Sequence, residues 1–376
     1  MSLSFKLALR NLLHDRLRLI ATIVGIVFSI VLVTVQVGVF VSFQRMATTM
    51  IDHASADLWV VPLGTKTFED TTLLDDRIRL RALSVDGIAG AVPLVIGSAP
   101  WRLPNGGTTP IFVVGSDLKA AGLHPWNIVE GSLEMLEAGN AAAVDQLYFK
   151  RLGVSQLGDS GEIRGQKARV TLITKGIRSF MMPYVFTSLE TARSYVGIEP
   201  AKATFFLLHL APEADVENVR REVRAAISDA EVLIPDEFRS RSRNFWLFET
   251  GAGGALFIGV LLGVIVGTVI VAQTLYSSTK EHFSEFATLR AIGASSRYIY
   301  KVIIFQALIS AVIGFSLATC VSLIIVKVTT DTPLPIVLTP LTILALFLLT
   351  VSMCVLSAIS SIVQVMKIDP VVAFAR

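Results

Sequence analysis

Four long apolar segments dominate the pattern of hydrophobic and polar positions along this chain. They cover residues 20–43, 251–276, 302–326 and 336–366. Each is long enough to cross a bilayer as a helix, which takes roughly 20 residues. No Asp, Glu, Lys or Arg lies inside any of the four. The pattern therefore predicts an integral membrane α-helical protein with four transmembrane helices.

Residues 44–250, between the first two predicted spans, follow a different pattern. Alternating apolar and polar positions predict strands, and helical periodicity predicts short amphipathic helices. The strands are expected at 56–61, 111–114, 168–173 and 203–210, and the helices at 77–85, 189–195 and 214–227. Residues 235–249 are expected to lead as a helix into the second span. This segment is therefore interpreted as an α+β extracytoplasmic domain of two subdomains, inserted between helices 1 and 2.

The distribution of Lys and Arg predicts the orientation, because short loops rich in them stay in the cytoplasm. Basic residues precede the first span and lie in the loop 277–301 and the tail 367–376. We therefore expect a cytoplasmic amphipathic entry helix at 1–19, a cytoplasmic coupling loop at 277–301, a short periplasmic loop at 327–335 and cytoplasmic termini. Basic residues also flank the outer ends of the first two spans, where we expect contacts with lipid headgroups or with the domain surface: Arg45, Arg239, Arg241 and Arg243. The first span is too long for the core of a secretory signal, which favours an uncleaved anchor over a cleaved one.

Composition supports the membrane assignment and removes several classes of function. Hydrophobic residues make up 53% of the 376, charged residues 17%, and the mean hydropathy is +0.65. The net charge of +3 is dispersed, so no nucleic-acid partner is expected. Both cysteines, Cys320 and Cys354, lie in apolar segments, and the five histidines are scattered. With no phosphate-binding loop of the P-loop type, we expect no catalytic site, no metal site and no cofactor bound by this chain itself.

Small residues recur at every fourth position in two of the predicted spans. In the second span they are Gly251, Ala255, Gly259, Gly263 and Gly267, and in the third they are Ser310, Gly314, Ala318 and Ser322. Residues four apart share one face of a helix, and small side chains let two helices approach closely in lipid. The stripe is a candidate packing or dimer interface that can move, or ordinary packing within one subunit.

A short polar break separates the second and third spans. It presents Glu281, Phe283, Glu285, Phe286, Leu289, Arg290 and Gly293. Helical spacing places the aromatic residues on one face, and the glycine is a typical stop signal. The segment is an amphipathic linker at the membrane surface or a helix that couples to a cytoplasmic partner; we favour the coupling helix. Phe180, Met181 and Met182 in the inserted domain are a candidate contact for a periplasmic partner or lipid, or part of the core.

Several motifs together resemble one family. Residues 285–294, the entry segment 8–12 and the tail 369–376 resemble the FtsX-like and MacB-like ABC transporter permeases. Residues 114–117 are similar to the MacB-like periplasmic core domain, and residues 56–60 resemble the DevC-like separate-permease branch. Ala287 stands where the family usually has glycine, and His282 where arginine is common.

The resemblance implies a mechanotransmitting (type VII) permease subunit in the cell inner membrane. A separate cytoplasmic ABC ATPase would bind ATP and Mg, and a second permease copy would complete a dimer. Contacts with membrane lipids, a periplasmic adaptor and an outer-membrane channel are expected, with export of a lipid, glycolipid, peptide or drug-like substrate. The alternatives are an FtsX-like regulator that activates a periplasmic cell-wall hydrolase and a lipoprotein-release permease.

Overall fold

The computed structural model describes residues 3–14, 16–281 and 295–366. The chain divides into two compact units. The helical unit consists of Met1–Ser42, Gly253–Thr330 and Pro335–Arg376, and the inserted domain consists of Phe43–Ala252 and Asp331–Leu334. Each unit has its own hydrophobic core, and we describe each by itself.

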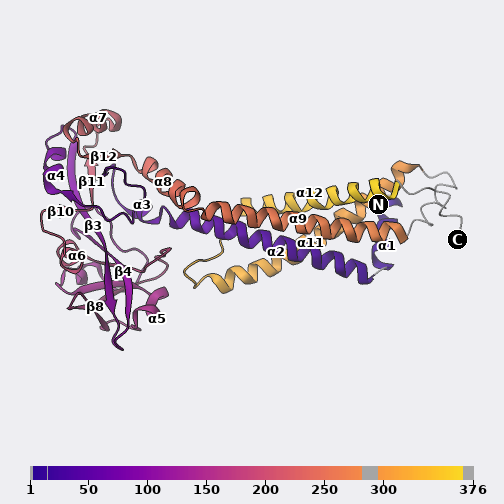
Figure 1. The fold of residues 1–376 in the computed structure, drawn as a ribbon, viewed down its shortest axis with the longest axis horizontal. Helices are drawn as coiled ribbons and strands as arrows, with labels where there is room; N and C mark the ends of the chain where they lie inside the picture. The colour runs from indigo at the N-terminus through magenta and orange to yellow at the C-terminus, as the bar shows by residue number, and fades with distance from the viewer. Residues whose placement is uncertain (1–2, 15, 282–294, 367–376) are drawn as a thin grey trace. The chain divides into compact units, whose positions relative to one another are not determined.

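Long apolar helices make up the helical unit (Figure 1). They are α1 (Leu3–His14), α2 (Arg16–Met46), α9 (Ala252–Glu281), α11 (Ser296–Thr329) and α12 (Pro340–Met366). Within the described residues, four of them are long and apolar enough to cross a membrane, all except α1. The predicted fold class is confirmed: four long apolar helices, with an α+β domain between the first and the second.

The core of the helical unit brings together residues from α2, α9, α11 and α12. Ile26 and Ile30 of α2 are buried against Val271 of α9, Ala307 of α11 and Met353 of α12. The amphipathic helix α1 packs on α11, where Ala8 is fully buried and Phe5 meets Phe305 edge to face with ring centroids 5.9 Å apart. α1 therefore lies against a membrane-spanning helix through its apolar face.

The small residues of α9 face α2 of the same chain. A Cβ atom added to Gly259 would lie 2.7 Å from the side chain of Gln36, and one added to Gly263 would lie 2.8 Å from Val33. Gly267 leaves no room for a Cβ beside Ser29, whose hydroxyl donates to the carbonyl of Gly263 at 2.8 Å. The described contacts of these three glycines are thus packing within one subunit.

The remaining small residues of the predicted stripes are partly exposed and partly buried. Ala255 is exposed on α9, and Gly251 lies just before that helix with nothing near the place of its missing Cβ. Gly314 of α11 faces Ile26, and Ala318 is fully buried. Close approach of α2 to both α9 and α11 therefore depends on small side chains, as packing in lipid requires.

A mixed ten-stranded sheet forms the inserted domain, with the order β12-β1-β11-β3-β4-β9-β6-β8-β5, while β7 pairs with β3 and β8. The strands are β1 (Leu58–Pro62), β3 (Ile88–Arg102), β4 (Thr108–Ser116), β5 (Ile128–Gly131), β6 (Ala141–Asp145), β7 (Ser160–Ile163), β8 (Gln166–Thr174), β9 (Tyr184–Ser188), β11 (Phe205–Leu210) and β12 (Ala230–Leu233). A separate pair joins β2 (Leu74–Asp75) to β10 (Lys202–Ala203). The pairings β3-β4-β9-β6-β8-β7-β3 close on themselves, so six strands form a ring and β11, β1 and β12 extend from it.

Helices cover both faces of the sheet. They are α3 (Thr49–His53), α4 (Asp76–Leu83), α5 (Phe149–Leu152), α6 (Leu189–Val196), α7 (Val216–Ala226) and α8 (Pro235–Asn244), with the 3-10 turns η1 (Leu133–Glu137) and η2 (Gln146–Tyr148) and the π turn η3 (Phe245–Glu249). Along β1, Leu58 and Val60 enter one core, and Trp59 and Val61 enter the other. All of β1 is therefore buried, as alternation of side chains between two covered faces requires.

Local sequence signals explain several of these elements. Gly106 has φ +90° in the turn between β3 and β4, and Arg164 and Gly165 have φ +50° and +80° between β7 and β8. Positive φ at both central residues, as at Arg164 and Gly165, is typical of a tight hairpin turn. Ser188 caps α6 by accepting from the backbone N–H of Thr191, and Asp215 caps α7 by accepting from that of Asn218.

Replacing Gly267 by Leu is expected to destabilise the helical unit. The added side chain has no space beside Ser29, and overpacking of this kind costs about 1–3 kcal/mol. Thermal unfolding of the detergent-solubilised protein should show a lower midpoint than wild type. Gly254→Leu on the same helix is the matched control, because nothing lies within 4 Å of the position of its Cβ. Equal midpoints for the two variants would contradict the packing of α9 on α2.

Candidate functional site

The candidate site is the part of the inserted domain that directly precedes α9 in the chain, together with the elements that contact it. We define the junction as α3, α8, η3 and the loop of residues 63–73 that follows β1. α8 begins with Pro235, whose missing N–H costs nothing at a first helical position. Acidic residues occupy its first turn and basic residues its last turn, as the helix dipole favours. Phe238 of α8 is fully buried, with its ring 5.1 Å from that of Trp59 on β1.

Ion pairs attach α8 and η3 to the elements around them. The pairs are Arg220 with Glu237, Arg239 with Asp52 at 2.6 Å, Arg241 with Glu231 at 2.8 Å, and Lys66 with Glu249. They connect α8 to α7, α3 and β12, and η3 to the loop 63–73. The arginines at 239 and 241 therefore contact the surface of their own domain, one of the two roles that the sequence left open.

Arg220 of α7 is a buried charge that contacts the junction through Glu237 of α8. Its side chain is 7% exposed, and its Nε donates to the carbonyl of Val232 at 3.3 Å. Glu237 accepts from its guanidinium, and Glu217 lies 3.3 Å from it. Hydrogen bonding from Arg220 holds the pKa of Glu237 below its usual range. A buried guanidinium is stable only with such partners, so this pair fixes α8 against α7.

An aromatic cluster fills the other side of η3. Phe180 lies between Phe43 and Trp246, with ring centroids 4.2 Å and 4.7 Å away. Lys66 lies over the ring of Phe245 at 5.6 Å, so the same loop contacts η3 by charge and by cation–π attraction. Of the three residues predicted as a periplasmic contact, Phe180 packs in this cluster, Met182 packs against the core, and Met181 is 59% exposed.

A partly buried carboxyl group lies beside this cluster. The hydroxyl of Tyr184 donates to Oε1 of Glu69 at 2.7 Å. Oε2 of Glu69 is shielded from solvent and has no hydrogen-bond partner, and the same holds for Nε1 of Trp246. Burial raises the pKa of the Glu69 carboxyl group. Tyr184 lowers this pKa, and Trp246 lowers it to a smaller extent.

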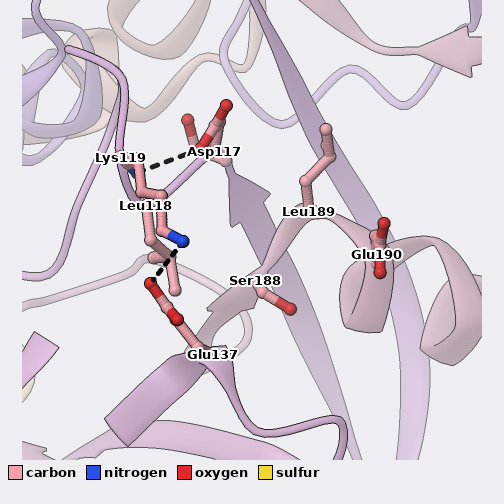
Figure 2. Close-up of a pocket in the computed structure, with 8 residues that line it drawn as sticks. Asp117, Leu118, Lys119, Glu137, Ser188, Leu189 and Glu190 are labelled. Atoms are coloured by element: carbon pink, nitrogen blue, oxygen red, sulfur yellow. Dashed lines mark hydrogen bonds and ion pairs between the residues drawn. The ribbon is translucent and has the colours of Figure 1, made fainter. Parts of the chain in front are cut away.

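A polar cavity of about 310 Å³ lies elsewhere in the inserted domain (Figure 2). It lies where the parallel strands β4 and β9 end, at Ser116 and Ser188, and where α6 begins. Lys119 and Glu137 form an ion pair at 3.4 Å in its lining, and Asp117 accepts from the backbone N–H of Lys119. No group of three or more His, Cys, Asp or Glu able to hold a metal occurs in the described part of the chain.

The predicted coupling residues lie mostly outside the described residues. Glu281 is the last residue of α9, and the others are Phe283, Glu285, Phe286, Leu289, Arg290 and Gly293. Conversely, no motif or spacing along the chain pointed to Glu69, Tyr184 or Arg220. The acidic first turn and basic last turn of α8 were a signal for its ion pairs, but the partner of Glu69 is 115 residues away in the chain.

Comparison with known families identifies the class of protein. Residues 19–226 match the MacB-like periplasmic core domain, and residues 257–370 match the FtsX-like permease C-terminal family. The first match covers more than half of the chain and includes every strand of the inserted sheet except β12. The chain belongs to the ABC transporter permeases of the FtsX/MacB type, a kind of subunit that usually lacks ATPase activity.

Its relatives include uncharacterized ABC transporter permeases of Mycobacterium tuberculosis, from strains CDC 1551 and H37Rv. They are 23% identical over 381 residues, covering 98% of this chain and 98% of each relative. The inserted domain is similar to the periplasmic region of MacB from Actinobacillus actinomycetemcomitans, with 9% identity, a TM-score of 0.38, and 52% of this chain and 96% of that one covered. It is also similar to the extracellular domain of the noncanonic ABC-type transporter YknZ from Gram-positive bacteria. The sequence identity is 13% and the TM-score 0.34, with 47% of this chain and 98% of that one covered.

Replacing Glu237 by Gln is expected to destabilise the inserted domain by about 1 kcal/mol, at the low end for a charge-assisted hydrogen bond because Glu237 is partly exposed. The pKa of this group is lowered by folding, so its contribution is full above the unfolded pKa and is lost as pH falls through the folded pKa. Thermal unfolding at neutral and acidic pH measures both effects.

Glu222→Gln is the control for this prediction, since Glu222 is exposed on α7, the helix that carries Arg220. The difference between wild type and Glu237→Gln should shrink under acidic conditions, whereas Glu222→Gln should resemble wild type throughout. An equal effect of the two variants would contradict a stabilising role for the Arg220–Glu237 pair.

Proposed function

We propose that this chain is the permease subunit of an ABC export complex that works by mechanotransmission. ATP binding and hydrolysis, with Mg, take place in a separate cytoplasmic ATPase, whose movement reaches the inserted domain through α2 and α9. The complex drives export of a lipid, glycolipid, peptide or drug-like substrate. A second permease copy completes it, and a periplasmic adaptor with an outer-membrane channel extends it.

The junction is the observation that carries this proposal. α8 and η3 directly precede α9 in the chain, and ion pairs attach them to α3, α7, β12 and the loop 63–73. A flexible linker at this position would absorb a displacement of α9. An α8 fixed by buried Phe238 and Arg220 instead passes that displacement to the sheet.

The spans themselves support a mechanical role over a conducting one. Residues 20–43, 251–276, 302–326 and 336–366 contain no Asp, Glu, Lys or Arg. Proton and ion pathways through a bilayer usually require ionisable groups facing the interior. Helices that contact one another through glycine and serine, as α9 contacts α2, are suited to moving together.

The proposed orientation follows from charge. Lys6, Arg10 and Arg16 before the first span and Arg297 and Lys301 at the start of the third are expected on the cytoplasmic side, with both termini. The loop between α9 and α11 would then face the ATPase, and the inserted domain would face the periplasm. The segment with Phe283, Glu285 and Phe286 is the proposed contact with the ATPase.

Charge reversal in this segment is expected to weaken the complex. Glu285→Lys and Phe286→Asp should each lower the amount of ATPase that co-purifies with the permease, because one reverses a charge of the proposed contact and the other replaces an aromatic side chain with a charged one. Membrane insertion should stay unchanged, as fractionation would show. Glu213→Lys, an exposed reversal in the inserted domain, is the matched control. Full recovery of the ATPase with both loop variants would remove this assignment.

Labelling of single cysteines in intact cells tests the orientation. In a background without Cys320 and Cys354, a membrane-impermeant maleimide should reach Lys119→Cys in the inserted domain but not Lys280→Cys at the end of α9. Permeabilised cells should label at both positions. Labelling of both positions in intact cells, or of Lys280→Cys alone, would overturn the proposed path from ATPase to periplasm.

Proteins that co-purify with the complex also separate the alternative functions. An adaptor and an outer-membrane channel favour export, a cell-wall hydrolase favours a regulatory role, and a lipoprotein carrier favours lipoprotein release. No contact of the described residues favours either alternative over export.

A further inference from the structure

One face of α1 is covered by protein. Phe5 meets Phe305 of α11 edge to face, and Ala8 is fully buried in a small cluster with Val302 of the same helix. Val302 and Phe305 both lie in the first three turns of α11, which begins at Ser296. This face therefore holds α1 against the start of a helix that can span the membrane.

The outer face of α1 forms an open hollow of about 390 Å³, lined by Lys6, Leu9, Arg10, Leu13 and His14. Lys6, Arg10 and His14 are exposed and lie four residues apart, so they share one side of the helix. Leu9 and Leu13 lie three residues after Lys6 and Arg10, so they run beside the polar side chains. None of the described residues that line the hollow is acidic. The hollow therefore combines positive charge with an apolar strip.

An exposed apolar face of α2 follows the hollow in the chain. Its residues lie three or four positions apart and are between 57% and 83% exposed: Leu17, Ile20, Val24 and Phe28. Leu17 comes only three residues after His14. On a helix that spans a bilayer, an exposed apolar face lies in contact with the acyl chains of lipids. A cationic hollow and a surface for an acyl chain are thus neighbours in the sequence.

We propose that the hollow on α1 binds an anionic phospholipid. The phosphate of the headgroup accepts hydrogen bonds from Lys6, Arg10 and His14. Leu9 and Leu13 contact the glycerol backbone and the first methylenes, and an acyl chain lies along the exposed face of α2. The site depends on neither the ATPase nor the export cargo, so it goes beyond the proposed function.

The chemistry of the lining favours this ligand over related ones. An ammonium and a guanidinium group donate charge-assisted hydrogen bonds to phosphate, and imidazole has an N–H donor in either charge state. A zwitterionic headgroup carries a phosphate too, but its own cation offsets the attraction of Lys6 and Arg10. A free phosphate ion would leave Leu9 and Leu13 exposed to water, whereas a lipid covers them. Clusters of Lys and Arg beside a membrane span attract anionic lipids for the same reason.

Native mass spectrometry of the full-length, delipidated protein in detergent tests the proposal. Phosphatidylglycerol should bind more tightly than phosphatidylcholine with the same acyl chains. Lys6→Gln and Arg10→Gln should each weaken the binding of phosphatidylglycerol by about 5-fold, and binding of phosphatidylcholine should change less. The combination of Lys6→Arg with Arg10→Lys keeps both charges and should bind like wild type.

A matched control removes the same number of charges elsewhere. Lys150 and Lys175 are exposed in the inserted domain, so the double variant Lys150→Gln with Lys175→Gln should bind phosphatidylglycerol like wild type. An excess of inorganic phosphate should displace little of the lipid, because phosphate alone does not cover the leucines.

Three results would overturn the lipid site. They are equal affinity for the two lipids in wild type, unchanged phosphatidylglycerol binding in the double variant Lys6→Gln with Arg10→Gln, and full displacement of the lipid by inorganic phosphate. The last result would assign the hollow to a free anion instead. All three are measured without the ATPase, so the proposed function would stand in each case.

Discussion

The attachment of α8 to the inserted sheet is the constraint on which the rest of this structure depends. α8 is short and its sequence is strongly charged, so it has little reason to be stable alone. Buried Phe238 and the Arg220–Glu237 pair fix it from two sides, while Arg239 and Arg241 reach α3 and β12. A membrane helix that continued into an unattached segment would move without consequence for the domain. Because α8 is attached, the sheet and the segment before α9 form one body.

Lipid imposes a second constraint, on how the helices pack. No hydrophobic effect draws helices together inside a bilayer, so close contact between backbones and a few polar bonds must do so. Gly263 and Ser29 show both, since the glycine admits α2 closely and the serine hydroxyl bonds to the glycine carbonyl. The sheet of the inserted domain is stabilised instead by two apolar cores, one on each face.

Much of the fold could be predicted from the sequence because its signals are local. Span length and the alternation of apolar and polar residues in 168–173 each depend on neighbouring residues alone. The sheet order could not be predicted, since β1 pairs with β11 and β12, both far away in the chain. The same reason hides the contact of Glu69 with Tyr184 and the burial of Arg220. The glycines at every fourth position of α9 predicted a surface for helix contact, but the sequence did not show that α2 is the helix they contact.

Gly251 separates η3 from α9 and has φ +76°, a conformation that residues with a Cβ rarely adopt. The hydrogen-bonded ladder of α9 therefore does not continue unbroken into the turn that is fixed to the sheet. A residue with a Cβ at this position would hold the left-handed conformation only with strain, so the break between η3 and α9 depends on glycine.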